Sequence, residues 1–176
     1  MSLLEAKSAI VEIADYPQPG VVFKDVTPVF ANPVAFQSII NEIALRFADL
    51  NVTAVVGIEA RGFILGGALA NQMKVGFVPV RKLGKLPRET YSAEYVLEYG
   101  SDAIEIHTDS LNSSDHVLIV DDVLATGGTV NATIDVIEQT GAAVVGFAIL
   151  LNLDFLGGAD RIAKEHPAVR LVSLLD

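Results

Sequence analysis

The segment VLIVDDVLATGGTV, residues 117–130, carries residue types that can bind a phosphate group. An apolar strand is expected to end at Asp121 and Asp122, and a turn of small residues then leads into a helix. Gly127 and Gly128 allow the backbone to approach a ligand closely, and the first amides of the new helix would point at an anion. Ligands of open α/β sheets bind beyond the carboxyl ends of the strands, where this turn would lie. The segment therefore predicts a site for a terminal phosphate.

Hydroxyl and carboxyl groups extend this predicted site. Thr126 and Thr129 add hydroxyl donors, and at least one of Asp121 and Asp122 could reach the hydroxyls of a sugar. The segment is neither a Walker loop nor the dinucleotide motif, because GxxxxGK[ST] and GxGxxG are both absent from it. Taken alone, the glycines also fit an ordinary turn between a strand and a helix. The complete unit of strand, paired acids, turn and helix favours a functional site.

Half of the basic residues lie in one segment, residues 60–88, which contains no Asp or Glu. They are Arg61, Lys74, Arg81, Lys82, Lys85 and Arg88. A basic segment in an acidic chain indicates a local anion site or, alternatively, a solvated basic surface. Because salt screens charges over ~8 Å, distant acids are expected to leave the positive potential there intact.

Composition limits the classes of protein to which the chain can belong. Its 176 residues, 51% of them hydrophobic, fit one domain with a core of its own. The absence of cysteine excludes disulfide scaffolds, thiolate catalysis and cysteine-ligated metal sites. The net charge of −10 argues against non-specific binding to nucleic acid, which needs cations to displace phosphate counterions. Neither a signal peptide nor an apolar run of ~20 residues is evident, so no membrane partner and a cytoplasmic location are expected.

Short apolar runs rich in β-branched residues alternate with helical patterns. The runs at 53–58, 76–80, 116–120 and 142–150 are typical of strands that are covered on both faces of a parallel sheet.

Three segments between these runs are expected to be helical. The first begins at Pro33, with Asn32 as its N-cap, and extends to residue 50, and the others cover 63–73 and 128–140. The alternation indicates an α/β fold with a central, mainly parallel sheet flanked by helices.

Three further segments lie outside this alternation. The residues at 95–100 and 103–107 predict a hairpin with its turn at Ser101 and Asp102. The prolines of residues 16–30 favour an irregular cap, and the polar residues of 83–93 favour a loop that could close as a lid.

The sequence VLIVDDVLATGGT resembles the phosphoribosyl pyrophosphate signature of the type I phosphoribosyltransferases. In order and spacing, PGVVFKDVTPVF, GIEARGF, VPVRKLGKLP and YVLEYGSDAIEIH resemble the adenine-specific members of that family, from about residue 16 to residue 175. The resemblance implies one domain over residues 1–176, with a small N-terminal hood over about residues 1–35. It also implies a purine-salvage enzyme that transfers 5-phosphoribose from phosphoribosyl pyrophosphate (PRPP) to adenine, giving AMP and pyrophosphate.

The resemblance implies a role for each group of site residues. The 5′-phosphate would be bound by Ala125, Thr126, Gly127, Gly128 and Thr129, and the ribose by Asp121 and Asp122. The pyrophosphate would be bound by Glu59, Ala60, Arg61, Gly62, Arg81, Lys82 and Lys85. Arg61 would be catalytic, because its guanidinium can donate a fork of hydrogen bonds to the leaving phosphate oxygens. A lone arginine after a strand is usually a surface residue, so only its context favours this role.

By the same resemblance, the base would be bound by Val22 and Lys24 of the hood, by Val123 and by Tyr99. Many relatives have arginine at the position of Lys24, a change of little weight if the backbone makes the contact. Glu98 would be the second catalytic residue, because a carboxyl group near the purine N7 can exchange a proton with the base. Without the resemblance, Val22 and Val123 fit the core and Glu98 fits an exposed strand.

The resemblance further implies a homodimer and Mg²⁺, which would reach the site through substrate oxygens and water rather than a direct protein ligand. Two alternative functions are open: a related transferase for another purine or a pyrimidine, and a nucleotide-sensing regulator without catalysis. The hood and the LEYG segment favour adenine. A regulator would need a second module or a basic DNA-binding surface, which this sequence does not offer.

Overall fold

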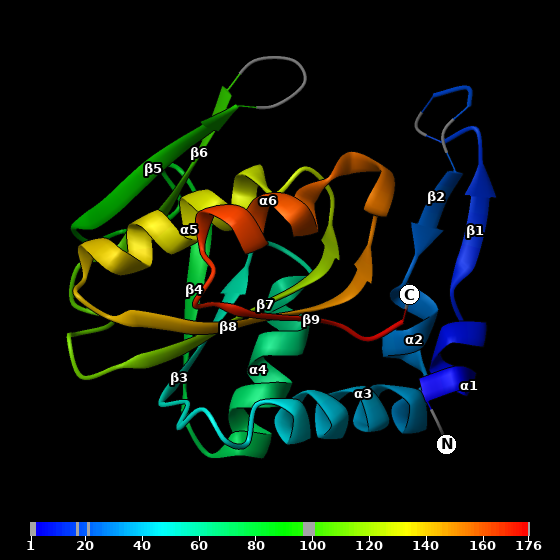
Figure 1. Cartoon of the computed structure of the whole chain (residues 1–176), viewed down its shortest axis with the longest axis horizontal. Coiled ribbons are helices and arrows are strands. Elements are labelled where there is room, and N and C mark those ends of the chain that lie inside the picture. The colour runs from blue at the N-terminus through cyan, green and yellow to red at the C-terminus, as the bar shows by residue number, and fades with distance from the viewer. Residues whose placement is uncertain (1–2, 17, 21, 97–100, 176) are drawn as a thin grey trace.

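Seven strands form the central sheet of the computed structural model, which describes residues 3–16, 18–20, 22–96 and 101–175. They are β3 (Ala54–Ile58), β4 (Gly76–Lys82), β5 (Thr90–Val96), β6 (Ser101–His107), β7 (His116–Leu124), β8 (Ala143–Asn152) and β9 (Arg170–Ser173). Their order is β5-β6-β4-β3-β7-β8-β9, with β4, β3, β7, β8 and β9 parallel and the β5–β6 hairpin antiparallel at one edge (Figure 1). The predicted α/β fold with a mainly parallel central sheet is therefore confirmed.

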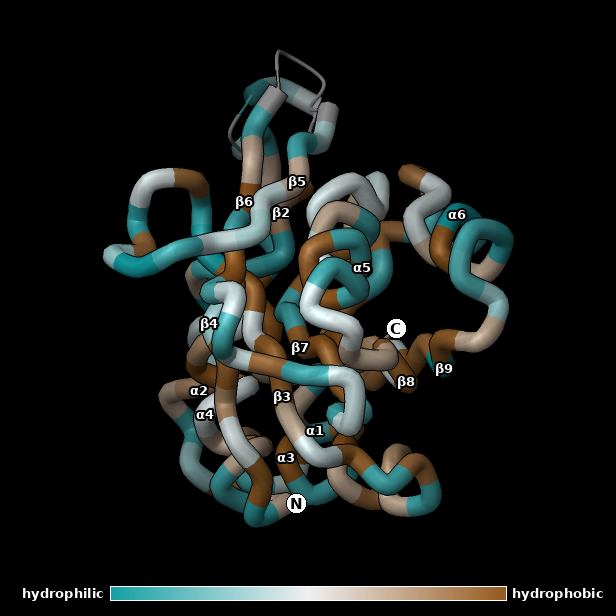
Figure 2. The backbone as a smooth tube through the Cα atoms, turned by 90° about the vertical axis from the view of Figure 1, so that its left-hand side faces the viewer, coloured by the Kyte–Doolittle hydropathy of each residue, from teal (hydrophilic) through white to brown (hydrophobic). Residues whose placement is uncertain are grey.

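Helices cover both faces of this sheet, so its central strands are buried on two sides. α3 (Pro33–Arg46) and α4 (Gly62–Met73) pack on one face, and α5 (Gly128–Gln139) and α6 (Gly158–Glu165) pack on the other (Figure 1). Figure 2 shows hydrophobic residues along the central strands β3 and β7, and all five residues of β3 are buried. The continuous apolar runs of the sequence thus reflect burial on both faces.

The predicted helices are confirmed, and the one at 33–50 ends early, at Arg46. The side chain of Asn32 accepts hydrogen bonds from the amides of Val34 and Ala35 at 3.0 and 3.1 Å, which confirms it as the N-cap of α3. Within the described ranges, none of the helices has both the length and the hydrophobicity needed to cross a membrane.

The N-terminal segment is more regular than the predicted cap. It contains α1 (Leu3–Ser8), the antiparallel strands β1 (Val11–Ala14) and β2 (Val22–Asp25), and α2 (Thr27–Ala31). The β1–β2 pair forms a separate sheet, and in Figure 1 it lies at the opposite end of the molecule from the β5–β6 hairpin, with both extending upward.

Three predicted boundaries are wrong. β7 continues to Leu124, so Asp121 and Asp122 lie within the strand rather than at its end. Ser101 and Asp102 pair with β5 and belong to β6, so the hairpin connection is at 97–100, outside the described residues. β5 begins at Thr90, so the predicted loop at 83–93 is shorter by the residues that enter this strand.

Candidate active site

The turn at residues 125–129 borders a cavity of about 90 Å³ beside the carboxyl end of β7. Gly127 has a φ of 80°, a left-handed conformation that favours glycine, and α5 begins at the next residue. Residues that flank the turn, and Phe147 of β8, also line the cavity; the flanking residues are Asp121, Val123, Leu124 and Val130. The free amides at the start of α5 and the small residues of the turn provide what an anion site requires.

A larger cleft of about 350 Å³ joins this turn to the turn that follows β3. The residues that line it are Ile58, Glu59, Ala60, Arg61, Lys82, Tyr95, Asp121, Asp122, Val123, Ala125 and Thr129. The structure therefore brings together members of the predicted phosphate, ribose and pyrophosphate groups. It adds Tyr95, which no pattern in the sequence singled out. Gly62 begins α4 directly behind this turn.

Asp121 and Asp122 are adjacent in β7 but have different surroundings. Asp122 is 4% exposed and its carboxylate pairs with the Nε atom of Arg61, whereas the Oδ1 atom of Asp121 accepts the amide of Asp122 at 2.9 Å. Burial and, next, the charge of Asp122 raise the pKa of Asp121 well above its usual range. These surroundings disfavour the charged form of Asp121, and a sugar hydroxyl that donates to this carboxyl group would offset part of that penalty.

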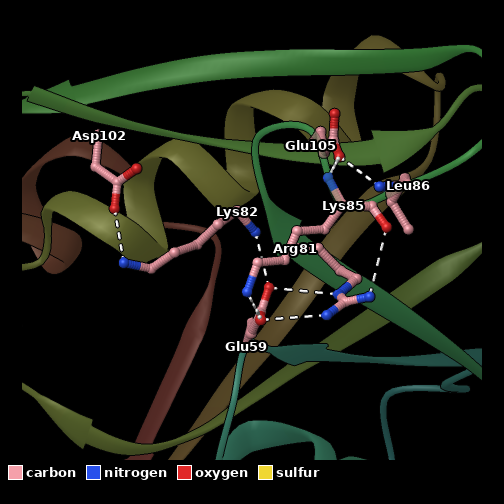
Figure 3. A network of polar contacts seen from close by, with 7 residues as sticks. All are labelled: Glu59, Arg81, Lys82, Lys85, Leu86, Asp102 and Glu105. Atoms are coloured by element: carbon pink, nitrogen blue, oxygen red, sulfur yellow. Dashed lines mark hydrogen bonds and ion pairs between the residues drawn. The ribbon is translucent and has the colours of Figure 1, made fainter.

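Glu59, the first residue after β3, organises the basic segment. Its carboxylate accepts hydrogen bonds from Arg81 at 3.2 and 3.3 Å, from the Nζ atom of Lys85 at 2.8 Å and from the amide of Lys82 at 3.0 Å (Figure 3). Burial by itself would raise the pKa of Glu59, but these hydrogen bonds outweigh it and lower the pKa to about 2. The carboxylate of Glu59 thus holds the basic side chains in place, and its predicted part in binding pyrophosphate stays a prediction.

The positive charge of residues 60–88 is opposed by nearby acids. Arg61 pairs with Asp122, Arg81 and Lys85 pair with Glu59, Lys82 pairs with Asp102, and Arg88 pairs with Asp109. Screening is expected to limit the effect of distant acids, but the fold also places carboxylates from other segments directly beside these cations, and these lower the local positive potential. An incoming anion would compete with those carboxylates.

Replacing Glu59 with glutamine is expected to destabilise the protein by about 3 kcal/mol at pH 7, because folding lowers the pKa of this carboxyl group from 4.5 to about 2. Because folding lowers this pKa, the ionised carboxylate stabilises the fold fully at a pH above its unfolded-state pKa of 4.5. This stabilisation decreases as the pH falls below 4.5 and is lost as the pH falls through about 2. Urea unfolding of both proteins at pH 7 and pH 3 should therefore show a smaller difference at pH 3.

The control is Glu42→Gln, which breaks an exposed pair with Arg46 within α3. Such a pair contributes only about 0.3–0.5 kcal/mol, so this variant should resemble the wild type. Equal stability of Glu59→Gln and wild type at pH 7 would contradict the role of Glu59.

The residues predicted to contact the base do not share one cavity. Val22 and Lys24 line a cavity of about 400 Å³ with Gly20 and residues 152–155, whereas Val123 lines the cleft and the phosphate cavity. Val22 is 54% exposed, which excludes the alternative that it is a core residue. Glu98 and Tyr99 lie outside the described residues, so their roles stay predictions.

The fold and the cleft together are those of a phosphoribosyl-transferring enzyme. The family model of the phosphoribosyl transferase domain matches this sequence over residues 29–175. The chain therefore belongs to the phosphoribosyl transferase family.

Its relatives are adenine phosphoribosyltransferases, as the sequence predicted. The enzyme named so from Shewanella loihica is 53% identical over 158 residues, which cover 90% of this chain and 87% of the relative. The crystal structure of adenine phosphoribosyltransferase from Thermoanaerobacter pseudethanolicus is 43% identical with a TM-score of 0.92, and 98% of each chain is covered. The Saccharomyces cerevisiae structure, a complex with adenine and an imino-altritol bisphosphate, is 37% identical with a TM-score of 0.91 and the same coverage.

Proposed function

We propose that this protein transfers 5-phosphoribose from PRPP to adenine, with AMP and pyrophosphate as products, in purine salvage. The observation that carries the proposal is the single cleft in which the phosphate turn, the paired acids and Arg61 meet. PRPP has a 5′-phosphate, a ribose and a pyrophosphate, so it needs these three binding groups side by side. Adenine as the acceptor is supported by the relatives that carry this activity in their names.

The reaction at C1′ exchanges one bond for another. The bond between C1′ and pyrophosphate breaks, its electron pair leaves with the pyrophosphate oxygen, and a ring nitrogen of adenine forms a bond from the opposite face. The turn at 125–129 holds the 5′-phosphate and so orients the sugar. Asp121 and Asp122 bind the ribose hydroxyls, and negative charge beside C1′ stabilises the cationic transition state. Arg61 exchanges Asp122 for the leaving phosphate oxygens.

The remaining predicted residues complete this scheme. Arg81, Lys82 and Lys85 add positive charge on the pyrophosphate side, with Glu59 holding two of them in place. Val22, Lys24, Val123 and Tyr99 contact adenine. Glu98 exchanges a proton with the base near N7.

We also propose that Mg²⁺ acts as cofactor, bound to PRPP. The carboxylates of Glu59 and Asp122 in the cleft are already paired with cations, which fits an ion held chiefly by substrate oxygens and water. When bound, Mg²⁺ neutralises charge on the pyrophosphate. We also propose a homodimer, which the family resemblance implies. A cytoplasmic location is supported by the absence of cysteine for disulfides.

Incubation of the protein with adenine and PRPP tests the function directly. AMP formation is expected in the presence of Mg²⁺ and should fall strongly when EDTA removes it. In competition with hypoxanthine, guanine, xanthine and orotate, adenine should be the preferred base. Preference for another base would refute the assignment of adenine, and undiminished AMP formation in EDTA would refute the role of Mg²⁺.

A further inference from the structure

Lys82 pairs with Asp102, which also accepts a hydrogen bond from Tyr95, and the reaction scheme gives neither Asp102 nor this contact a role. Tyr95 of β5 and Asp102 of β6 lie directly opposite each other in the hairpin. The Nζ atom of Lys82 contacts Oδ2 of Asp102 at 2.9 Å, and the Tyr95 hydroxyl donates to the same oxygen at 3.3 Å. Figure 3 shows the Lys82 side chain extending away from Glu59 toward Asp102. The Oδ2 atom of Asp102 therefore accepts from both the charged Lys82 amine and the neutral Tyr95 hydroxyl.

Tyr95 also reaches the other half of the cleft. It lines the cleft together with Lys82 and Thr129, and its ring packs against the core beneath the hairpin. Thr129 belongs to the phosphate turn, so Tyr95 and this turn border the same cleft. Burial raises the pKa of Tyr95, so its hydroxyl keeps the proton that it donates to Asp102. Tyr95 thus stands between the two predicted anion sites.

A pyrophosphate that recruits Lys82 must take it from Asp102. The Asp102 carboxylate, 26% exposed, would then keep two donors inside the protein: the amide of Ala103 on Oδ1 at 2.9 Å and the Tyr95 hydroxyl on Oδ2. A carboxylate that loses a cation but retains a donor on the same oxygen is less destabilised than one left with no donor there.

We propose that Asp102 is the resting counter-ion of Lys82 and that Tyr95 is a positioning residue, which stabilises Asp102 when Lys82 turns to pyrophosphate. This inference rests on the proposed function for the identity of the anion. Asp102 competes with pyrophosphate for Lys82. The hydrogen bond from Tyr95 to Asp102 lowers the free energy needed to move Lys82 from Asp102 to pyrophosphate. The two residues touch each other, yet their effects on pyrophosphate binding are opposite in sign.

Opposite signs make the inference testable. Asp102→Asn keeps the shape of the side chain and an acceptor for Tyr95 but removes the competing charge, so pyrophosphate should bind about threefold more tightly. Tyr95→Phe keeps the ring and removes only the hydroxyl, so pyrophosphate should bind about fivefold more weakly, the effect of one net hydrogen bond. The control is Tyr91→Phe, on the same face of β5 and also packed against the core, which should change nothing.

The measurement is isothermal titration of magnesium pyrophosphate into each protein after saturation with ribose 5-phosphate. This sugar occupies the phosphate turn and cannot react with pyrophosphate to give PRPP without further activation. Its own affinity, measured first, should be the same in all four proteins if the turn is intact.

Weaker pyrophosphate binding in both Asp102→Asn and Tyr95→Phe would show a merely structural role and overturn the inference. So would an unchanged affinity in Tyr95→Phe, or a wild-type protein that does not bind pyrophosphate. AMP formation is assayed separately: a wild-type protein that binds pyrophosphate with these variant effects but forms no AMP would refute the proposed function and not the role of Tyr95.

Discussion

Replacing Arg61 with lysine is expected to lower AMP formation by about 10²–10³-fold while the protein stays folded. Arg61 lines the cleft beside the phosphate turn, and its planar guanidinium can donate two parallel hydrogen bonds to the oxygens of a leaving pyrophosphate. Lysine retains a positive charge but lacks that fork. Steady-state assays should show the loss chiefly in kcat, because the charge on the leaving group develops as the bond to C1′ breaks.

Comparison with Arg61→Ala separates catalysis from folding. The Asp122 side chain, 6% exposed, would lose its cation in the alanine variant, and an unpaired buried carboxylate costs about 3 kcal/mol or more. Lysine should restore most of that stability in urea unfolding without restoring turnover. Wild-type turnover in Arg61→Lys would contradict the need for a guanidinium, and wild-type stability in Arg61→Ala would show that the pair with Asp122 contributes little.

The central layer of the fold could be predicted because local patterns determine it. A continuous run of β-branched residues is typical of a strand that is covered on both faces. The Asn32-Pro33 pair marks a helix start because the Asn32 side chain accepts hydrogen bonds from the first free amides of the helix. The hairpin turn was misplaced for a physical reason. Ser101 and Asp102 have the composition of a turn, but pairing with β5 draws them into the strand.

The candidate site was predictable in its residue types and not in its contacts. The phosphate turn is contiguous in sequence, so its glycines, hydroxyls and helix start can be recognised together. The cation pairs with Asp102, Asp109 and Asp122 join residues far apart in the chain, and no periodicity encodes them. The basic segment therefore suggested a stronger positive potential than the folded protein provides.

Gly158 is another contact that the sequence did not reveal, and it leads to the second large expected effect. It begins α6, and a Cβ atom at this position would lie 2.2 Å from the carbonyl oxygen of Ala125 in the phosphate turn. The next nearest atoms belong to the turn as well, including the amide nitrogen of Gly127 at 3.1 Å. Backbone on both sides leaves no flexible side chain that could move aside, so the turn itself must shift.

Gly158→Ala is therefore expected to weaken ribose 5-phosphate binding and AMP formation by about 10²-fold, because displacing a binding group by ~1 Å has effects of that size. Titration of ribose 5-phosphate measures the effect without the chemical step. The variant should remain folded, with a free energy of unfolding in urea that is about 1–3 kcal/mol lower because of the overpacking.

The matched control is Gly67→Ala in α4, where a Cβ meets nothing within 4 Å. That change should leave ribose 5-phosphate affinity unaltered and raise stability by about 0.5–1 kcal/mol through helix propensity. Unaltered affinity in Gly158→Ala as well would mean that the turn tolerates displacement, and that α6 is not needed to shape the phosphate site.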